Sequence, residues 1–326
     1  MTALRLGTRG SALALWQARS VAALLEVSGA PVEIVVITTG GDRLQQAPVS
    51  EVGGKRLFVK EIEDALLAGE IDVAVHSAKD MSAVLPDGVE IAAVLPREDP
   101  RDVIVLPAGK ENEAKDFPAA VAHLDRGNAA IGTGSIRRAA QLSVLLPHAR
   151  FRAIRGNVDT RLRKLDAGEF EGLVLAAAGL RRLGLGGRIS AAVPIAVCIP
   201  APGQGIVAIE IRSSDDRARR ALSSAGHAET GISLAAERAV VTALGGGCQL
   251  PLGAIALHED GVLRMHGVVA SPDGGRVVRR DTSGPTDDPH GVGRRLAEAL
   301  VTGGAMEILD ALRFGAQDGL GEPSQP

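Results

Sequence analysis

Short apolar runs alternate with helical patterns over much of the chain, and this alternation limits the possible folds more than any other feature. Residues 4–8 and 32–38 are strand-like, and between them residues 12–27 carry apolar side chains at helical spacing. A strand, a helix and a strand at this spacing predict a βαβ unit within a parallel sheet. The predicted buried stripe of this helix consists of Leu13, Trp16, Val21 and Leu24.

The alternation continues in two groups of strands separated by prolines. A helix is expected at residues 57–68, and the strands that complete the first sheet are expected at residues 71–75, 89–95 and 206–211. Prolines then indicate a domain crossing near residues 100–107,. The strands of a second sheet are expected at residues 103–106, 129–132, 151–154 and 172–178. Residues 200–205 resemble a rigid hinge back to the first domain, with Gln204 facing the cleft.

The C-terminal part of the chain has a different pattern, with a helix on each side of a group of strands. The first helix is expected from residue 228, the strands near residues 252–256, 262–270 and 276–282, and the second helix from about residue 290. At 326 residues the chain is also long for one core,. We therefore predict an α/β protein with domains at residues 1–102 plus 203–225, residues 103–202, and residues 226–326, the last a small α+β domain with a loose tail after Phe314.

Composition excludes several classes of protein. The chain is 45% apolar and 23% charged, which is ordinary for a globular protein,. No apolar run reaches the ~18 residues that a membrane span needs, and the N-terminal residues lack the apolar stretch of a secretory signal,. Neither Cys198 nor Cys248 has a Cys or His partner at zinc-ligand spacing, and Cys198 lies in an apolar run that predicts a buried, inert thiol,. A cytoplasmic protein that binds no metal and no membrane is expected.

Positive charge is concentrated in one stretch, although the whole chain carries a net charge of −3. Between Asn128 and Leu165, seven Arg and one Lys stand against the single Asp159, a local net charge of +7. Nucleic acid would suit such a patch, but aromatic residues make up only 2% of the chain, so platforms for base stacking are scarce,. A small ligand with several carboxylates or phosphates is the better fit.

Polar side chains follow two strands of the first sheet at their carboxyl ends, where open α/β sheets bind ligands. Arg9 and Ser11 follow the first strand, although a surface Arg beside a capping Ser would give the same pattern,. Lys79 and Asp80 follow the strand at residues 71–75, within a His-Ser-Ala-Lys-Asp segment. A carboxylate beside a Lys stays ionised and can stabilise a cation or carry a proton, so a functional role is favoured over a solvated helix start.

Two junctions between strand and helix in the second sheet are rich in arginine. Thr133-Gly-Ser-Ile-Arg-Arg138 opens one expected helix, and Arg155-Gly-Asn-Val-Asp-Thr-Arg161 leads into the next. Helix N-termini offer free N–H groups and the positive end of the helix dipole, so both junctions suit an anion. The first junction is the stronger candidate because its polar side chains come from Thr133, Ser135, Arg137 and Arg138.

One thiol follows a run of glycines in the C-terminal part of the chain. A helical pattern ends at Leu244, three glycines follow, and Cys248 comes next, before a strand-like run from Pro251. Glycines end the helix because they adopt positive φ angles freely. The local pattern fits a thiol presented for covalent chemistry and a small buried core residue about equally well.

Six segments, taken together, carry a resemblance to a known family. They are Leu6-Gly-Thr-Arg-Gly-Ser-Ala-Leu-Ala-Leu-Trp16, Gly53-Gly-Lys-Arg-Leu-Phe-Val-Lys-Glu61, Val75-His-Ser-Ala-Lys-Asp80, Gly132-Thr-Gly-Ser-Ile-Arg-Arg138, Arg155-Gly-Asn-Val-Asp-Thr-Arg-Leu162 and Gly245-Gly-Gly-Cys-Gln-Leu-Pro-Leu-Gly253. They occur in the family's order and span nearly the whole chain. The sequence therefore resembles the porphobilinogen deaminase family, also called hydroxymethylbilane synthases.

The resemblance implies both a fold and an activity. It implies three α/β domains, the first two with mixed sheets laid out as in periplasmic binding proteins. It also implies a dipyrromethane cofactor joined to Cys248 by a thioether, on which four porphobilinogen units condense head to tail with loss of ammonia. Water then releases 1-hydroxymethylbilane for tetrapyrrole (haem) biosynthesis. The implied partners are porphobilinogen and the growing pyrrole chain, without nucleic acid or membrane, and a monomer is the family expectation.

The same resemblance implies roles for individual residues. Asp80 would be the catalytic carboxylate that faces pyrrole nitrogens and stabilises an azafulvene cation. The positions implied to bind the cofactor are Cys248, Lys79, Asp80, Thr133, Ser135, Arg137, Arg138 and Arg155. The positions expected to bind substrate are Arg9, Ser11, Arg155, Arg161, Lys55, Phe58 and the hinge residue Gln204. Lys55 belongs to a polar, Gly-rich segment at residues 39–56 that we expect to form a mobile loop or lid.

Two positions depart from the family pattern, and one other class of function remains possible. Gly134 stands where Ser is common, which removes a hydroxyl anchor, and Ser82 stands where Pro often follows the Lys-Asp pair. The alternative function is a non-catalytic anion-binding module of the periplasmic-binding-protein type. That class would need neither Asp80 nor Cys248, and it would be expected to carry a signal peptide.

Overall fold

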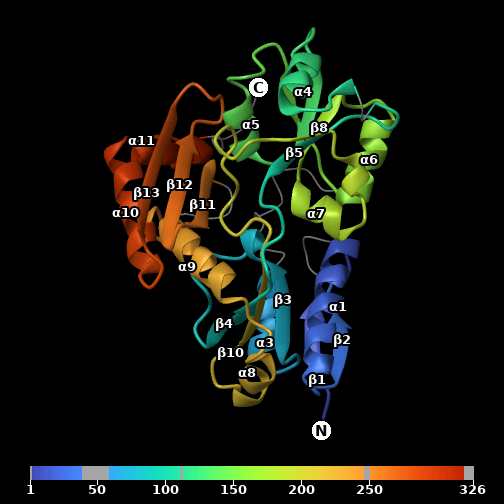
Figure 1. Cartoon of the computed structure of the whole chain (residues 1–326), viewed down its shortest axis with the longest axis vertical. Helices are drawn as coiled ribbons and strands as arrows, with labels where there is room; N and C mark the ends of the chain where they lie inside the picture. Colours follow the sequence, from blue (N-terminus) through green and yellow to red (C-terminus); the bar gives the residue numbers. More distant parts are fainter. Residues whose placement is uncertain (1, 39–58, 111–112, 246–249, 319–326) are drawn as a thin grey trace, which may run out of the picture.

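The computed structural model in Figure 1 contains three β-sheets with helices packed against them. The structure describes residues 2–38, 59–110, 113–245 and 250–318. Two five-stranded sheets mix parallel and antiparallel strands, and the three strands of the C-terminal sheet are all antiparallel. The predicted α/β architecture with a separate C-terminal α+β part is therefore confirmed, while the residue limits of the domains stay a prediction.

The first sheet has the strand order β2-β1-β3-β10-β4. Its strands are β1 (Leu4–Thr8), β2 (Val32–Val36), β3 (Val73–Ser77), β4 (Val89–Val94) and β10 (Val207–Arg212). β1 pairs in parallel with β2 and β3, whereas β10 runs antiparallel to β3 and β4. The late strand predicted at residues 206–211 thus joins the first sheet, as expected. We call this sheet with its helices the first lobe.

Helices α1 (Ala12–Val27), α3 (Lys60–Leu67) and α8 (Asp216–Leu222) belong to the first lobe. α1 begins where predicted, because the Ser11 hydroxyl accepts a hydrogen bond from the Ala14 N–H at 3.3 Å. The predicted stripe was wrong for Trp16 and Leu24, which are 38% and 42% exposed. The buried face keeps Val21 of the predicted stripe and otherwise consists of Gln17, Ala18, Ala22 and Leu25.

Strand β3 lies two residues later in the chain than the sequence pattern predicts. The expected strand covered residues 71–75, whereas β3 includes His76 and Ser77. Both residues pair with β10, with Ala208 opposite His76 and Val207 opposite Ser77. A partner strand that arrives late in the sequence therefore extends β3, and local hydrophobicity could not indicate this.

The second sheet has the order β7-β6-β8-β5-β9 and forms the core of the second lobe. Its strands are β5 (Asp102–Val105), β6 (Ala130–Thr133), β7 (Arg150–Ala153), β8 (Gly172–Ala176) and β9 (Ala191–Ala192). β6 is parallel to β7 and β8, and β5 is antiparallel to β8 and β9. The helices of this lobe are α4 (Phe117–Leu124), α5 (Ile136–Leu142), α6 (Val158–Asp166) and α7 (Ala177–Arg182), with the 3₁₀ turn η5 (Gly186–Arg188).

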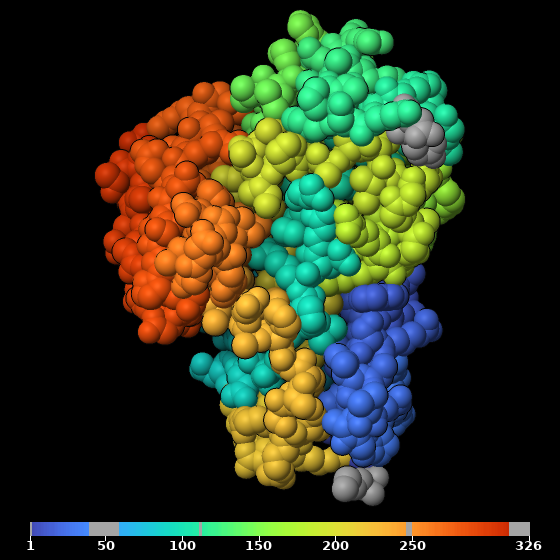
Figure 2. Space-filling view, viewed as in Figure 1, coloured from blue at the N-terminus to red at the C-terminus, as the bar shows by residue number. Residues whose placement is uncertain are grey.

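The C-terminal part packs helices on an antiparallel sheet, and Figure 2 shows it beside both lobes. Its strands are β11 (Leu252–Glu259), β12 (Val262–Ala270) and β13 (Val277–Pro285), and its helices are α9 (Ala228–Ala243), α10 (Pro289–Thr302) and α11 (Ala305–Asp318). α11 continues past Phe314 to Asp318, and the rest of the expected loose tail lies outside the described residues. We call this part the third domain.

The first and second lobes are joined by two crossover segments, residues 95–101 and residues 193–206. The carboxylate of Glu237 on α9 lies fully buried where these segments meet the third domain. It accepts hydrogen bonds from Arg97 at 2.6 Å, from the Gly203 N–H at 2.6 Å and from the Ala256 N–H at 2.8 Å. One buried charge therefore ties both crossovers to the third domain.

Candidate functional site

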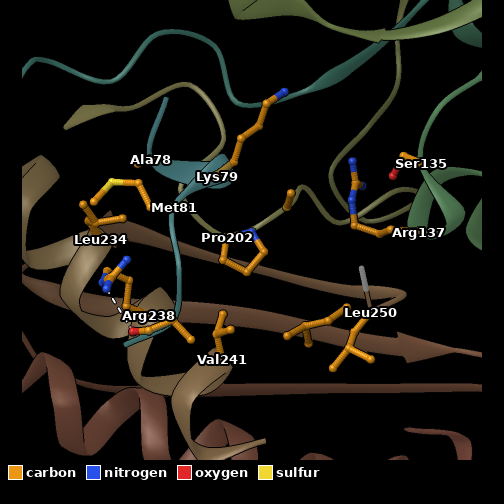
Figure 3. A pocket seen from close by; sticks show the side chains of 13 residues that line it. Ala78, Lys79, Met81, Ser135, Arg137, Pro202, Leu234, Arg238, Val241 and Leu250 are labelled. Atoms are coloured by element: carbon orange, nitrogen blue, oxygen red, sulfur yellow. Dashed lines mark hydrogen bonds between the residues drawn. The ribbon is translucent and has the colours of Figure 1, made fainter. Parts of the chain in front are cut away.

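A small cavity lies where the two lobes and the third domain meet, and Figure 3 shows the side chains around it. Its volume is about 80 Å³. Lys79 comes from the first lobe, Ser135 and Arg137 come from the second, and Arg238 and Leu250 come from the third domain. We call this space the central cavity; Lys79, Arg137 and Arg238 are the cationic residues of a lining that is otherwise mostly apolar.

The Lys79-Asp80 pair stands on the short 3₁₀ turn η3 (Ala78–Asp80), directly after β3. The Ala78 N–H donates to the Ile206 carbonyl at 3.0 Å, which fastens the turn to the second crossover. Gly203 has a φ of +74°, and a Cβ there would lie 2.9 Å from the Ala78 carbonyl carbon. A side chain at Gly203 would therefore push the turn away, so this glycine is needed for the close approach.

Two arginines at the start of α5 are buried in the wall of the second lobe. Arg137 is 4% exposed and Arg138 is 6% exposed. Both contact the carboxylate of Asp102, with Arg137 Nη2 at 2.8 Å from Oδ2 and Arg138 Nε at 2.9 Å from Oδ1. Burial alone would raise the pKa of Asp102, but the charges of Arg137 and Arg138 outweigh burial and hold this pKa below its usual range,.

The hinge residue Gln204 is also part of this buried cluster. Its side-chain amide donates to the Pro100 carbonyl at 2.7 Å and to Asp102 Oδ1 at 2.8 Å. Gln204 is only 1% exposed, so the side chain is an internal link between the crossovers, and the expectation that it faces an open cleft was wrong. The physical reason is the buried charge of Asp102, which needs neutral donors as well as cations around it.

Arg161 on α6 lies close to charged groups of both lobes. Its Nε donates to the Gly156 carbonyl at 2.7 Å, and no ion pair to a carboxylate is seen for it within the described part of the chain. Burial, helped by the positive charge of Arg138, lowers the pKa of Arg161 to about 10, while the charge of Asp80 acts in the opposite direction. The fold therefore brings Asp80 of the first lobe within electrostatic range of Arg161 of the second.

Hydroxyl groups just before α5 and α1 accept hydrogen bonds from nearby backbone N–H groups. The Ser135 N–H donates to the Thr133 hydroxyl at 3.3 Å, and Ser11 caps α1. A Cβ at Gly134 would lie 3.1 Å from the Ile154 carbonyl and 3.6 Å from Arg161 Nη2. The family departure at Gly134 therefore leaves room beside the Arg161 guanidinium.

The remaining predicted site residues divide into those that the structure places and those that it does not. Arg9 follows β1 and Arg155 precedes α6, and both side chains are half-buried. The structure does not describe three of the predicted site residues, which are Lys55, Phe58 and Cys248. The predicted loop at residues 39–56 also lies outside the described residues. Lys79, Asp80, Ser135, Arg137, Arg138 and Arg161 are the predicted residues that the fold brings to one region.

Sequence reasoning missed three residues at this junction. Asp102 has the only visible signal, an acid at the start of an apolar strand. Arg182 at the end of α7 lies over the ring of Trp16, 5.5 Å from its centroid, and burial lowers the Arg182 pKa. Arg238 on α9 donates to the Ala83 carbonyl at 2.9 Å (Figure 3). Arg182 and Arg238 gave no local signal, because their surroundings come from distant parts of the chain.

A second and larger hollow, of about 510 Å³, lies between β4 and α9. Its walls include Ile91, Ala93, Gly231 and His290, together with Arg238. It is mostly apolar and contains none of the predicted residues at the strand ends, so its size does not make it the functional site. Within the described ranges, no helix has the length and apolar character needed to cross a bilayer.

Comparison with known proteins was consistent across the length of the chain. Residues 4–220 match the family "Porphobilinogen deaminase, dipyromethane cofactor binding domain", and residues 232–302 match "Porphobilinogen deaminase, C-terminal domain". The chain is 46% identical to a porphobilinogen deaminase of Syntrophotalea carbinolica over 95% of its own length and 96% of the relative. It is 47% identical to one of Acidithiobacillus ferrooxidans over 95% of its own length and 98% of the relative.

Comparison with solved structures found matches of low sequence identity. The periplasmic VFT2 domain of Bordetella pertussis BvgS aligns with 70% of this chain and 90% of its own, at 18% identity and a TM-score of 0.39. An ancestral cationic amino acid solute-binding protein aligns with 68% of this chain and 86% of its own, at 17% identity and a TM-score of 0.38.

Proposed function

The chain belongs to the porphobilinogen deaminase family, and from that premise we propose that it joins four porphobilinogen molecules head to tail. Each addition releases one ammonia, the product grows on a dipyrromethane primer attached to Cys248, and hydrolysis releases 1-hydroxymethylbilane. The observation that carries the proposal is that Arg161 of the second lobe lies near enough to the carboxylate of Asp80 in the first lobe, and to the guanidinium of Arg138, for both charges to act on it. An enzyme that develops positive charge on a substrate rich in carboxylates needs an acidic group to stabilise that charge and basic groups to bind the carboxylates, close to one another.

The residues around the central cavity fit a dipyrromethane with acidic side chains. Lys79 and Arg137 supply cations, Ser135 supplies a hydroxyl, and Leu250 on the cavity wall is two positions from Cys248. Arg137 Nε is buried and has no hydrogen-bond partner among the described residues, so a donor is available there. At about 80 Å³ the cavity can hold only part of a two-ring group, since whole ligand pockets are usually several hundred Å³,. The residues that we propose to hold the cofactor are Lys79, Thr133, Ser135, Arg137, Arg138 and Arg155.

When bound, the dipyrromethane supplies the pyrrole carbon to which the first substrate unit is joined. We assign Asp80 the task of stabilising positive charge on the substrate's pyrrole nitrogen while ammonia leaves. Arg161 is suited to a substrate carboxylate, because a partly desolvated guanidinium gains more from an anion than a solvated one does. Arg9, Ser11 and Arg155 are assigned to the other acidic side chains of the substrate. Arginine suits this work because its planar group binds a carboxylate through two hydrogen bonds.

The expected setting of the reaction follows from the family. We propose a cytoplasmic transferase that acts as a monomer, with porphobilinogen and the growing pyrrole chain as its partners. Size-exclusion chromatography with light scattering would check the monomer, because a dimer would give twice the 33.5 kDa of one chain.

Intact mass is the most direct test of the proposed function. The purified protein should be heavier than its sequence by one two-ring group, and Cys248→Ser should lose this added mass. The matched control is Cys198→Ser, which changes the only other cysteine of the chain and should keep the added mass. Wild-type protein that carries no adduct and consumes no porphobilinogen would point to the alternative, a non-catalytic anion-binding module.

A further inference from the structure

A single buried carboxylate at the start of β5 contacts both arginines that begin α5. Asp102 is fully buried, and each of its oxygens meets one guanidinium. Arg137 Nη2 lies 2.8 Å from Oδ2, and Arg138 Nε lies 2.9 Å from Oδ1. Because the two arginines are adjacent in sequence while Asp102 belongs to another element, the carboxylate fixes how the two guanidiniums are oriented relative to the sheet.

Two neutral groups complete the surroundings of Asp102. The Gln204 side-chain N–H donates to Oδ1 at 2.8 Å, and the Cys198 thiol donates to Oδ2 at 3.3 Å. Burial and then the nearby carboxylate of Asp102 raise the pKa of Cys198 to about 12, so the thiol keeps its proton. Each oxygen of Asp102 therefore accepts one charged and one neutral hydrogen bond, which compensates a buried charge well.

Both guanidiniums also donate hydrogen bonds to backbone carbonyls. Arg137 Nη1 donates to the Ile199 carbonyl at 2.6 Å, and Arg138 Nη1 donates to the Val174 carbonyl at 3.1 Å. Neither side chain can rotate without losing these contacts along with the bond to Asp102. Arg137 nevertheless lines the central cavity, and its buried Nε has no partner within the described part of the chain. Both guanidiniums are thus held in place by Asp102 and the backbone, and Arg137, which lines the central cavity, keeps an N–H group for a ligand.

We propose that Asp102 is a positioning residue for the reaction: it orients Arg137 and Arg138 so that their remaining donors bind ligand carboxylates. This proposal rests on the proposed function, since it assumes an acidic ligand in the central cavity. One negative charge against two positive charges leaves a net positive charge for that ligand. A fixed pair of arginines also loses less conformational freedom on binding than two mobile ones.

The crossover segment directly before β5 contains a matched control residue, Asp99. Its carboxylate also bridges two arginines, with Arg101 Nη2 at 2.8 Å and Arg181 Nη2 at 3.0 Å. Arg101 and Arg181 are 41% and 47% exposed at their side chains, so this bridge faces outward. Asp99→Asn and Asp102→Asn therefore make the same chemical change three positions apart, and only the second acts on Arg137 and Arg138.

The experiment compares wild type, Asp102→Asn and Asp99→Asn as full-length purified proteins. Intact mass gives the fraction that carries the two-ring adduct, and steady-state kinetics on the loaded protein give KM and kcat separately. Asp102→Asn should lower the loaded fraction at least twofold and reduce kcat/KM about 10- to 100-fold, mainly through KM, because the arginines are misplaced. Asp99→Asn should match wild type in both measurements.

Several outcomes would overturn the positioning role. Asp102→Asn with a wild-type loaded fraction and wild-type KM would do so. So would a parallel loss in both variants that follows their thermal midpoints, because that result would show a structural effect alone. If Asp102→Asn fails to fold, Gln204→Met removes one donor to Asp102 without changing charge; it should raise KM two- to fivefold, and an unchanged KM would reject the proposal. Wild-type protein without any adduct would instead overturn the proposed function, which separates the two failures.

Discussion

In each lobe, three parallel strands are followed across the sheet by one strand in the opposite direction and then by a fifth strand antiparallel to that one. The orders are β2-β1-β3-β10-β4 in the first lobe and β7-β6-β8-β5-β9 in the second. The middle strands of the two parallel groups end alike: β1 ends at Thr8 and Ser11 precedes α1, and β6 ends at Thr133 and Ser135 precedes α5. Both threonines are buried. The two lobes therefore use the same backbone plan at the position where ligands of open α/β sheets usually bind.

The lobes differ in the charges that the same plan presents. Asp80 stands three positions after the end of β3, and the equivalent position after β8 is Gly179. The second lobe presents Arg137, Arg138 and Arg161 instead, and its carboxylate in this region, Asp102, is fully buried. This difference shows that the strand order fixes where polar groups gather, while the identity of the residues at the strand ends fixes which charge each lobe presents. On our proposal, the first lobe carries the acid that favours a cation, and the second carries the cations that hold carboxylates.

The largest effect is expected when the acidic position of the first lobe is made neutral. Asp80→Asn should reduce turnover about 10²- to 10⁴-fold, because the group that stabilises positive charge is lost. The fold should persist, since Asp80 is only half-buried. Rates of porphobilinogen consumption would be compared with those of Asp64→Asn, an exposed acid on α3. Turnover within twofold of wild type would remove Asp80 from its role.

The comparison also assumes that the lobes keep a fixed relation through the third domain, which Glu237→Gln would disturb. Arg97 would then lose its charged partner at a fully buried site. The free energy of unfolding should fall by about 3–5 kcal/mol, as is usual when one member of a buried pair is removed. Urea unfolding measures this loss, with Glu229→Gln at an exposed site of the same helix as the control. A change below about 1 kcal/mol, typical of surface substitutions, would contradict the prediction.

A change in the second lobe should act mainly on binding. Arg161→Leu removes the half-buried guanidinium that we assign to a substrate carboxylate, which is worth about 1.5–3 kcal/mol,. We expect a loss of about 10- to 150-fold in kcat/KM, carried chiefly by KM. Arg163→Leu is the control, because Arg163 is exposed on the same helix. Equal kinetics for both variants would show that α6 contributes no carboxylate site.

The smallest effect is expected where the two lobes touch at α1 and α7. Arg182→Leu removes the guanidinium over Trp16, which costs about 0.5–1 kcal/mol of stability,. Trp16 is the only tryptophan of the chain, so its fluorescence reports this contact directly. The emission should shift in Arg182→Leu and stay unchanged in Arg181→Leu, its exposed neighbour. An unshifted spectrum would mean that the contact in the structure does not persist in solution.

The strand-end positions of the site could be predicted because their signals are local. Ser11 caps α1 from three residues away, and the Lys79-Asp80 turn follows β3 directly. The cluster around Asp102 could not be predicted in this way. Asp102 and Arg138 are 36 positions apart, and Asp102 and Gln204 are 102 positions apart. Nothing near any of these residues indicates that their side chains meet inside the protein.

The exposure of single side chains was also decided beyond the local pattern. Helical spacing favoured Trp16 for the buried stripe of α1, yet the helix packs through Ala18 and Ala22, and Trp16 faces Arg182 of the other lobe. Gln204 was expected to face the cleft, but its side-chain amide instead donates a hydrogen bond to the buried carboxylate of Asp102. In both cases the partner belongs to an element far away in the sequence.

The sequence by itself determined where the strands end and which acidic, basic and hydroxyl groups follow them, because caps, turns and hydrophobic periodicity act over a few residues. Only the tertiary structure decided which arginines turn inward to Asp102 and which remain near Asp80. That choice depends on how a buried charge is compensated, and the compensating groups come together only when the two crossovers and the three sheets are assembled.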